Sequence, residues 1–206
     1  MLVQGQVGPV ASTQSLSPGI QAPARAGNMG DLIVSELHGR YYEAAYRRAL
    51  FNAANQAAQA TSVALATAYT GLVLSNPIGS PVNLVLNKVG IALTAAPAAI
   101  AAIGLMAGYN SGANVTHTTP GTPRNKFFGA GAAGSGLVDT AATLPTAPVL
   151  VEPLMGGFTA AALPGVGPAL VDVEGGLILP PGAYAAIYSL TSITGLFSFD
   201  WEEVPV

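Results

Sequence analysis

Near the C-terminus, residues 196–202 read LFSFDWE and show the clearest alternation of apolar and polar residues in the chain. In an extended strand successive side chains point to opposite faces, so one face here collects Phe197, Phe199 and Trp201. The polar residues between them point to the other face. This pattern predicts a half-buried antiparallel strand that closes the domain.

Short apolar runs separated by turn residues recur upstream of this strand. Turns are expected at 76–81 and 180–182, because proline presets φ and glycine allows positive φ. Further strands are expected at 32–37, 70–74, 84–93, 100–106, 149–151, 170–173, 176–179 and 183–190. Many short strands, with no alternation of strands and helices, predict a mainly β protein, an antiparallel β-sandwich or jelly roll.

Three segments differ from this simple pattern. Residues 41–60 fit a short helix, but strands at 50–51 and 63–65, joined by a polar stretch rich in Asn and Gln, fit equally well. The segment 108–136, rich in Gly, Ser, Thr and Pro, is expected to be a loop. In the strand at 84–93 the apolar residues are expected on both faces, with Val85, Val89, Ile91 and Leu93 on one and Leu84 and Leu86 on the other.

Residues 1–30 are rich in Gln, Ser, Gly and Pro, and their apolar residues are too scattered to form one face of a helix or strand. We therefore expect an extended N-terminal arm over 1–30 that packs on a neighbouring chain, followed by one domain over 31–206. The apolar residues of the arm are the expected contacts with other subunits or with a capsid: Val3, Val7, Val10, Leu16 and Ile20.

Charged residues make up only 8% of the 206 residues, against roughly 25% in ordinary soluble domains. A monomer of this size exposes roughly 9,000 Å², and seven basic and ten acidic side chains are few for that surface. The shortage indicates permanent assembly, in which much of the surface is buried against neighbours. The net charge of −3 argues against a nucleic-acid partner, and the absence of cysteine excludes disulfides and thiolate metal sites.

The candidate catalytic motifs do not meet the geometry that catalysis requires. Residues 129–134, GAGAAG, match the dinucleotide fingerprint, but a strand and a helix do not flank them. Ser35, Glu36 and His38 are triad residue types, yet on a strand Ser35 points away from the other two. His117 has no second histidine near it in the sequence. We therefore expect no enzymatic activity, no cofactor and no metal.

Two acidic pairs and one apolar run likewise predict no functional site. Asp172 and Glu174 share a strand face, which would hold Ca²⁺ only with further oxygens from a loop. Glu202 and Glu203 face opposite sides of a strand and are expected to be surface charges or ion-pair partners for another subunit. Residues 89–109 are uncharged, but Pro97 and three glycines interrupt them, so no membrane span is expected.

A concentrated patch of basic and aromatic residues lies at Arg40, Tyr41, Tyr42, Tyr46, Arg47 and Arg48. Interleaved Arg and Tyr can stack on nucleic-acid bases, and they are also enriched at protein interfaces. Because the chain has a net negative charge, the second interpretation is favoured. The patch is expected to be an interface with other subunits or with a capsid.

Three stretches resemble a group of small virion proteins of tailed bacteriophages: DLIVSELHGRYY at 31–42, the Asn76-Pro77 turn with its flanking strands, and WEEVP at 201–205. The resemblance spans roughly residues 31–206. It implies a jelly-roll-like domain attached to the phage head as a decoration (cement) protein, often as a homotrimer. It implies no catalytic residues.

The sequence thus predicts a structural virion protein on the phage head surface, made in the host cytoplasm. Its expected partners are the major capsid protein and copies of itself, with neither nucleic acid nor membrane. The alternative is a binding module of the tail, fibre or baseplate. In that case the segment 108–136 contacts a glycan of the host surface, with Tyr109, Phe127 and Phe128 as aromatic platforms.

Overall fold

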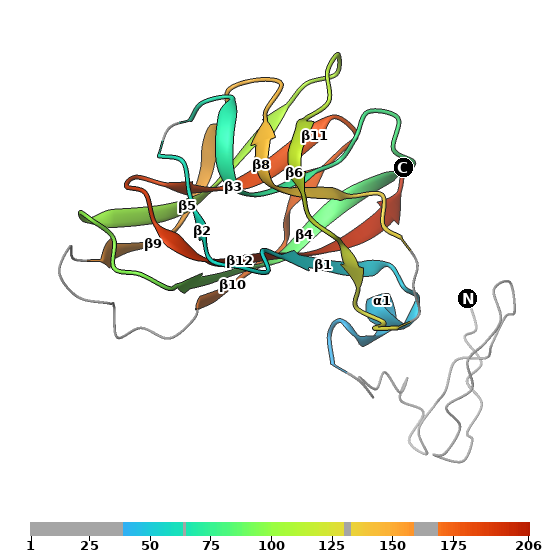
Figure 1. Ribbon diagram of the computed structural model, residues 1–206. Helices are drawn as coiled ribbons and strands as arrows, with labels where there is room; N and C mark the ends of the chain where they lie inside the picture. Colours follow the sequence, from blue (N-terminus) through green and yellow to red (C-terminus); the bar gives the residue numbers. More distant parts are fainter. Residues whose placement is uncertain (1–38, 64, 130–132, 159–168) are drawn as a thin grey trace, which may run out of the picture. The chain divides into compact units, whose positions relative to one another are not determined.

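The computed structural model describes residues 39–63, 65–129, 133–158 and 169–206. The chain divides into two units, residues 1–42 and 43–206. The second unit contains nearly all of the described structure (Figure 1). The expected arm over 1–30, with its five apolar contact residues, and the expected strand at 32–37 lie outside the described residues.

One short helix and twelve strands make up the described part of the chain. They are α1 (Tyr42–Tyr46), β1 (Leu50–Ala54), β2 (Gln59–Ala60), β3 (Ala68–Ser75), β4 (Val82–Leu93), β5 (Ala101–Tyr109), β6 (Thr116–Pro120), β7 (Arg124–Asn125), β8 (Leu137–Thr143), β9 (Val149–Phe158), β10 (Ala169–Leu179), β11 (Ala183–Ser189) and β12 (Thr194–Pro205). Residues 41–60 therefore begin with a single helical turn, and β1 covers the strand expected at 50–51. The second expected strand, at 63–65, is corrected: β2 lies at Gln59–Ala60, and Val63 and Leu65 are outside the strands.

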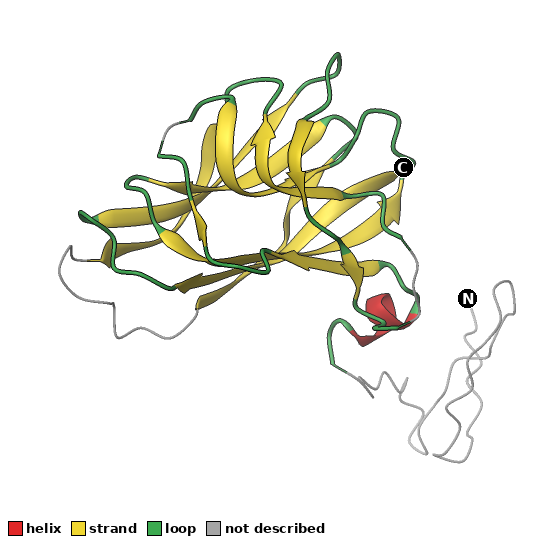
Figure 2. Cartoon of the chain, in the orientation of Figure 1, coloured by secondary structure: helices red, strands yellow, loops and turns green. Residues whose placement is uncertain are grey.

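The strands form two six-stranded antiparallel sheets that pack face to face, as the two layers in Figure 2 show. In the first sheet the strand order is β10-β4-β12-β1-β7, with β2 paired to β12. In the second sheet it is β6-β8-β3-β11-β5-β9. The predicted antiparallel β-sandwich is confirmed.

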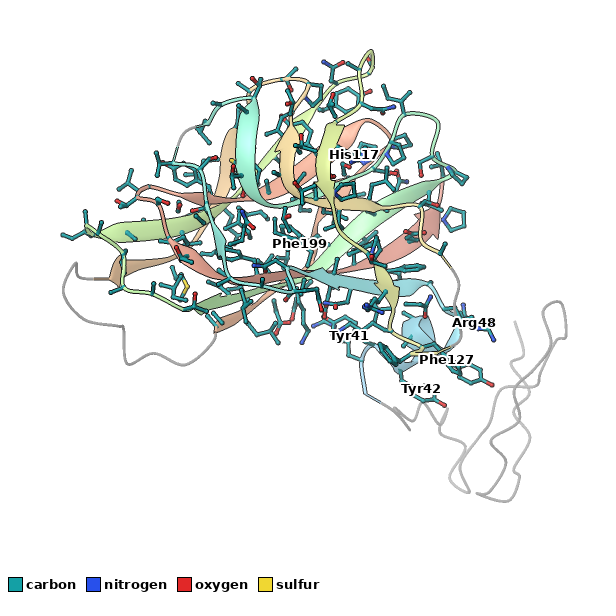
Figure 3. The ribbon with its side chains drawn as sticks, viewed as in Figure 1. Tyr41, Tyr42, Arg48, His117, Phe127 and Phe199 are labelled. Atoms are coloured by element: carbon teal, nitrogen blue, oxygen red, sulfur yellow. The ribbon has the colours of Figure 1, made fainter. Side chains whose placement is uncertain are left out.

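The strand predicted from residues 196–202 is confirmed as the middle strand of the first sheet. β12 lies between β4 and β1, and Phe197, Phe199 and Trp201 are each at most 1% exposed. Trp201 stacks on Phe51 of β1 with ring centroids 6.0 Å apart. Figure 3 shows Phe199 in the space between the two layers. These rings fill the core together with Leu and Ile side chains of both sheets.

The predicted faces of β4 are wrong on one side of Asn87. Pairing with β12 passes from Lys88 directly to Leu86, so Asn87 is an extra residue that reverses the alternation. Val85 therefore points away from the core, opposite to the face of Val89. The core face of β4 collects Leu84, Leu86, Val89 and Ile91.

Several predicted strand boundaries are also corrected. The segment 108–136 is not all loop, because it contains β6 and β7. β8 was not predicted at all, and β9 extends beyond the run predicted at 149–151. The strands predicted at 170–173 and 176–179 are one strand, β10. Its bulge lies where Glu174 and Gly175 have φ of 55° and 80°.

The uncharged run at 89–109 belongs to β4 and β5 and the turn between them. Among the described residues, no helix has the length and apolar character needed to cross a membrane.

A second apolar cluster covers the outer face of the second sheet, away from the core between the layers. It consists of Tyr69, Val73, Met106, Val115, Ala142, Leu144, Tyr184 and Ala186. The tyrosine hydroxyls find partners: Tyr69 donates to the carbonyl of Ile187 and Tyr184 to that of Thr146, at 2.5 and 2.6 Å. This face therefore excludes water, although no third sheet covers it within the described part of the chain.

Candidate functional site

Four of the five basic residues of 43–206 lie at the border of the first sheet formed by β1 and β7. Arg124 of β7 lies opposite Asn52 of β1. The side-chain amide of Asn125 donates to the carbonyl of Arg48 at 2.7 Å, which joins the turn before β1 to β7. The four exposed basic residues are Arg47, Arg48, Arg124 and Lys126. We call them the basic border.

Aromatic rings accompany these charges. Phe127, directly after Lys126, meets Tyr46 edge to face with ring centroids 6.2 Å apart. The guanidinium of Arg48 lies 5.6 Å from the centroid of Phe127, within the range of a cation–π contact. Phe128 is 82% exposed. Figure 3 shows Arg48 and Phe127 side by side. Exposed aromatic and Arg side chains are typical of protein interfaces.

The basic and aromatic patch predicted at 40–48 lies in part on this border. Tyr46, Arg47 and Arg48 are at the border, and the structure adds Phe127, which the sequence placed in a different group. In the unit 1–42, Arg40 lies over the ring of Tyr41 at 5.6 Å. Tyr42 begins α1 with 44% of its surface exposed. The arm residues Val3, Val7, Val10, Leu16 and Ile20 lie outside the described residues.

One of the basic side chains is held by an internal ion pair. Lys126 Nζ lies 2.9 Å from a carboxylate oxygen of Asp200, and Asn52 donates to the other oxygen of the same carboxylate. Lys126 therefore serves partly to hold the segment after β7 against the face of β12. In contrast, the exposed Arg124 forms no ion pair with any residue that the structure describes.

An apolar groove on the same sheet extends from β10 across β4 and β12 to the end of β1. Leu170 and Leu196 line it together with small residues such as Gly90 and Ala92. A Cβ atom on Gly90 would lie 2.3 Å from Oγ of Ser198, so a larger residue at position 90 would require the Ser198 side chain to move. The groove has a volume of about 330 Å³.

The aromatic residues proposed as a glycan platform do not gather in one place. Tyr109 lines a second groove, of about 320 Å³, together with Val149 and Ile178 of β9 and β10. Phe127 instead packs on Tyr46 at the basic border. Because β10 and β7 are the opposite border strands of the first sheet, Tyr109 and Phe127 do not belong to one surface cluster.

The predicted chemistry-bearing residues have structural partners. His117 Nδ1 bonds a carboxylate oxygen of Asp139, a buried residue that the sequence analysis did not single out. Asp172 forms an ion pair with Lys88 at 3.1 Å. The Glu203 carboxylate accepts the backbone N–H of Ser135 on both oxygens, at 2.8 and 3.0 Å, and the backbone N–H of Gly136 at 2.9 Å. The sequence predicted a surface charge or an ion-pair partner for another subunit at Glu203, whereas this carboxylate is bonded within its own chain.

Within the ranges that the structure describes, no three His, Cys, Asp or Glu side chains gather as a metal site would require. The described surface thus offers exposed charges, exposed rings and shallow apolar grooves, which are features suited to contact with another macromolecule. Comparisons with protein-family models, with curated proteins and with solved structures found no match.

Proposed function

We propose that this protein is a structural component of a virus particle, a decoration protein of a tailed-bacteriophage head. It self-associates and binds the major capsid protein. The observation that supports this proposal best is the basic border, where exposed Arg48, Phe127 and Phe128 lie in the segments next to the paired strands β1 and β7. Such side chains form the centre of many protein interfaces.

The composition of the chain supports the same proposal. Only 8% of its residues are charged, while large apolar side chains such as Val149, Leu170 and Ile178 are more than half exposed. A freely diffusing protein with this surface is prone to nonspecific association. A virion protein avoids that outcome because its neighbours cover the exposed apolar surface.

The resemblance to virion proteins of tailed bacteriophages is the reason for proposing a phage particle and a position on its head. The expected arm supplies a second contact with the capsid. An extended segment that buries several hundred Å² of apolar surface gains roughly 25 cal/mol per Å² before its ordering cost is subtracted. On this proposal, a chain that lacks residues 1–30 still folds but no longer sediments with capsids. Tight binding of the truncated chain to capsids would contradict the role of the arm.

The number of copies per purified particle tests the proposal directly. Quantitative mass spectrometry against the major shell protein is expected to give a ratio near one to one for a protein that decorates the whole shell. A few to a few dozen copies would indicate a vertex, tail or fibre instead. Absence of the chain from particles would contradict a structural role in the virion.

A second candidate is a binding module of the tail, fibre or baseplate that contacts a host-surface glycan. The exposed rings of Tyr46, Phe127 and Phe128 favour it, since sugars stack on exposed aromatic rings. This candidate predicts glycan-array binding that is lost in Phe128→Ala. If the chain is present on the particle but binds no glycan on such an array, decoration is the only one of the two candidate functions that remains.

A further inference from the structure

A row of polar residues crosses the whole outer face of the first sheet, with one residue from each strand in turn. Arg124 of β7 lies opposite Asn52 of β1, and Asn52 lies opposite Asp200 of β12. Asp200 lies opposite Lys88 of β4, and Lys88 lies opposite Asp172 of β10. Directly opposed side chains on neighbouring strands are close enough to interact. The row therefore connects the two borders of the sheet.

The interior of this row is electrostatically paired. Asn52 donates to Asp200, and Lys126 forms an ion pair with the same carboxylate. At the β10 end, Lys88 pairs with Asp172 at 3.1 Å, but the side chain of Asp172 is still 49% exposed. At the β7 end, the exposed Arg124 has no ion-pair partner among the described residues. The row thus ends in a cation at one border and an anion at the other.

A second cation lies beside the β7 end of the row. Exposed Arg48 is at the same border as Arg124, and the acidic residues nearest to it on β12 are Asp200, which is paired with Lys126, and Glu202. At the β10 end, the half-exposed carboxylate of Asp172 is the charge that ends the row. The basic border therefore presents exposed cations, and β10 presents an exposed carboxylate.

Each border also presents apolar surface next to its charges. Phe127 and Phe128 follow the basic residues of the β7 border, and Phe128 is 82% exposed. At the β10 border, two residues before Asp172, Leu170 is 60% exposed and lines the apolar groove with Leu196. The two borders are complementary in charge, and one projects rings where the other is hollowed.

From this arrangement we propose that copies of this chain associate head to tail, with the β7 border of one copy on the β10 border of the next. Arg124 of one copy then faces Asp172 of its neighbour, and the polar row continues from copy to copy. This inference rests on the proposed function in that it names the surfaces through which the protein self-associates. The occupant of each border is a second copy of the chain.

A head-to-tail contact differs from a two-fold contact in its consequence for the number of copies. It uses two different surfaces, so each copy still has one unused border after the first contact forms. Association therefore continues until a ring closes or a filament grows, and it gives three or more copies. Because the facing charges are exposed, the contact is expected to weaken as salt concentration rises.

Sedimentation equilibrium of the full chain tests this arrangement. We expect the wild type at about 0.1 M salt to have a mass of at least three chains. Arg124→Glu alone and Asp172→Lys alone are each expected to shift the mass to that of one chain, because like charges then face each other. The double variant R124E/D172K is expected to recover the wild-type mass, since the swapped charges again attract. Trp201 fluorescence reports whether each variant is folded.

A matched control is Glu152→Lys, which makes the same change of charge as Asp172→Lys at an exposed position of β9, in the other sheet. It is expected to keep the wild-type mass. A wild type that is a monomer or stops at a dimer would overturn the proposal. So would an Arg124→Glu variant that keeps its mass, or a folded double variant that stays monomeric. These outcomes are independent of the copy number on particles, which tests the proposed function.

Discussion

His117 Nδ1 lies 2.5 Å from Oδ2 of Asp139, and this bond joins an exposed border strand to a fully buried carboxyl group. His117 is in β6, whose five residues are all exposed, and Asp139 is in the neighbouring β8 with 0% of its surface exposed. The second carboxyl oxygen of Asp139 has no hydrogen-bond partner in the described structure. His117 is thus the side chain that satisfies this buried acid, and it fixes β6 on the sheet.

We expect His117→Ala to lower the free energy of unfolding by about 2–3 kcal/mol, because it leaves a buried polar group without its partner. Asp139→Asn is expected to cost less, since a neutral amide is less costly to bury than a carboxylate. Urea unfolding followed by Trp201 fluorescence measures both. Thr118→Ala, at an exposed position of the same strand, is the control and is expected to change stability by less than about 0.5 kcal/mol. A His117→Ala variant with wild-type stability would show that the pair does not stabilise the fold.

The sequence predicted the sandwich because period-two patterns such as that of residues 196–202 depend only on local geometry. It failed where one inserted residue changes the pattern, as at Asn87, since a bulge depends on the pairing of three strands. β8 was missed because its sequence, LVDTAAT, has Asp139 where an apolar residue would complete the alternation. Asp139 could have been found only by pairing it with His117, 22 residues earlier.

The same difference, between local patterns and features that depend on strand pairing, explains which residues of the candidate site were predicted. Tyr46, Arg47 and Arg48 were found because they are neighbours in sequence. Phe127 joins them only because β7 pairs with β1, which brings residues about eighty positions apart into contact. The polar row from Arg124 to Asp172 was not visible in the sequence for the same reason, since each of its members comes from a different strand.

Stability is expected to fall above pH 10. Burial raises the pKa of Tyr69 far above its ordinary value of 10.0, and burial also raises the pKa of Tyr184. In the unfolded chain these tyrosines lose their protons near pH 10, while in the folded protein they hold them to higher pH. The folded state then binds more protons, so the free energy of unfolding is unaffected below pH 10 and decreases above it, by at most about 1.4 kcal/mol per pH unit for each tyrosine.

Urea titrations between pH 8 and pH 11 measure this decrease. Tyr69→Phe is expected to be less stable at pH 8 by about 1 kcal/mol, because its hydrogen bond to Ile187 is lost. It is expected to lose less stability than the wild type between pH 10 and pH 11. Tyr109→Phe, at a position 58% exposed, serves as the control and is expected to follow the wild type. An equal decrease in Tyr69→Phe and the wild type would exclude Tyr69 as a source of the pH dependence.

The turn between β10 and β11 is expected to tolerate no side chain at position 182. Gly182 has φ of 91°, and a Cβ atom there would lie 2.5 Å from the carbonyl oxygen of Asn110. Gly182→Ala is expected to destabilise the protein by about 3 kcal/mol, from the strained φ and the displaced backbone together. Gly79→Ala is a matched control, because φ is 82° there but no atom lies within 4 Å of the new Cβ. It is expected to cost about 1 kcal/mol. Thermal unfolding distinguishes the two variants. Equal losses of stability would show that the backbone at Asn110 moves to accommodate the new Cβ atom at no cost in free energy.

Glu203 is expected to matter for stability but not for association. Its carboxylate accepts the backbone N–H groups of Ser135 and Gly136, and Nε1 of Trp201 donates to it at 3.3 Å. Glu203→Gln removes the charge from these bonds and is expected to lower the free energy of unfolding by about 2 kcal/mol. The sedimentation mass is expected to stay at the wild-type value, because the group is already bonded within its own chain. Glu202→Gln changes the same charge at the adjacent position and is expected to leave stability within about 0.5 kcal/mol of the wild type. A folded Glu203→Gln variant with a reduced mass would instead assign Glu203 to the contact between copies.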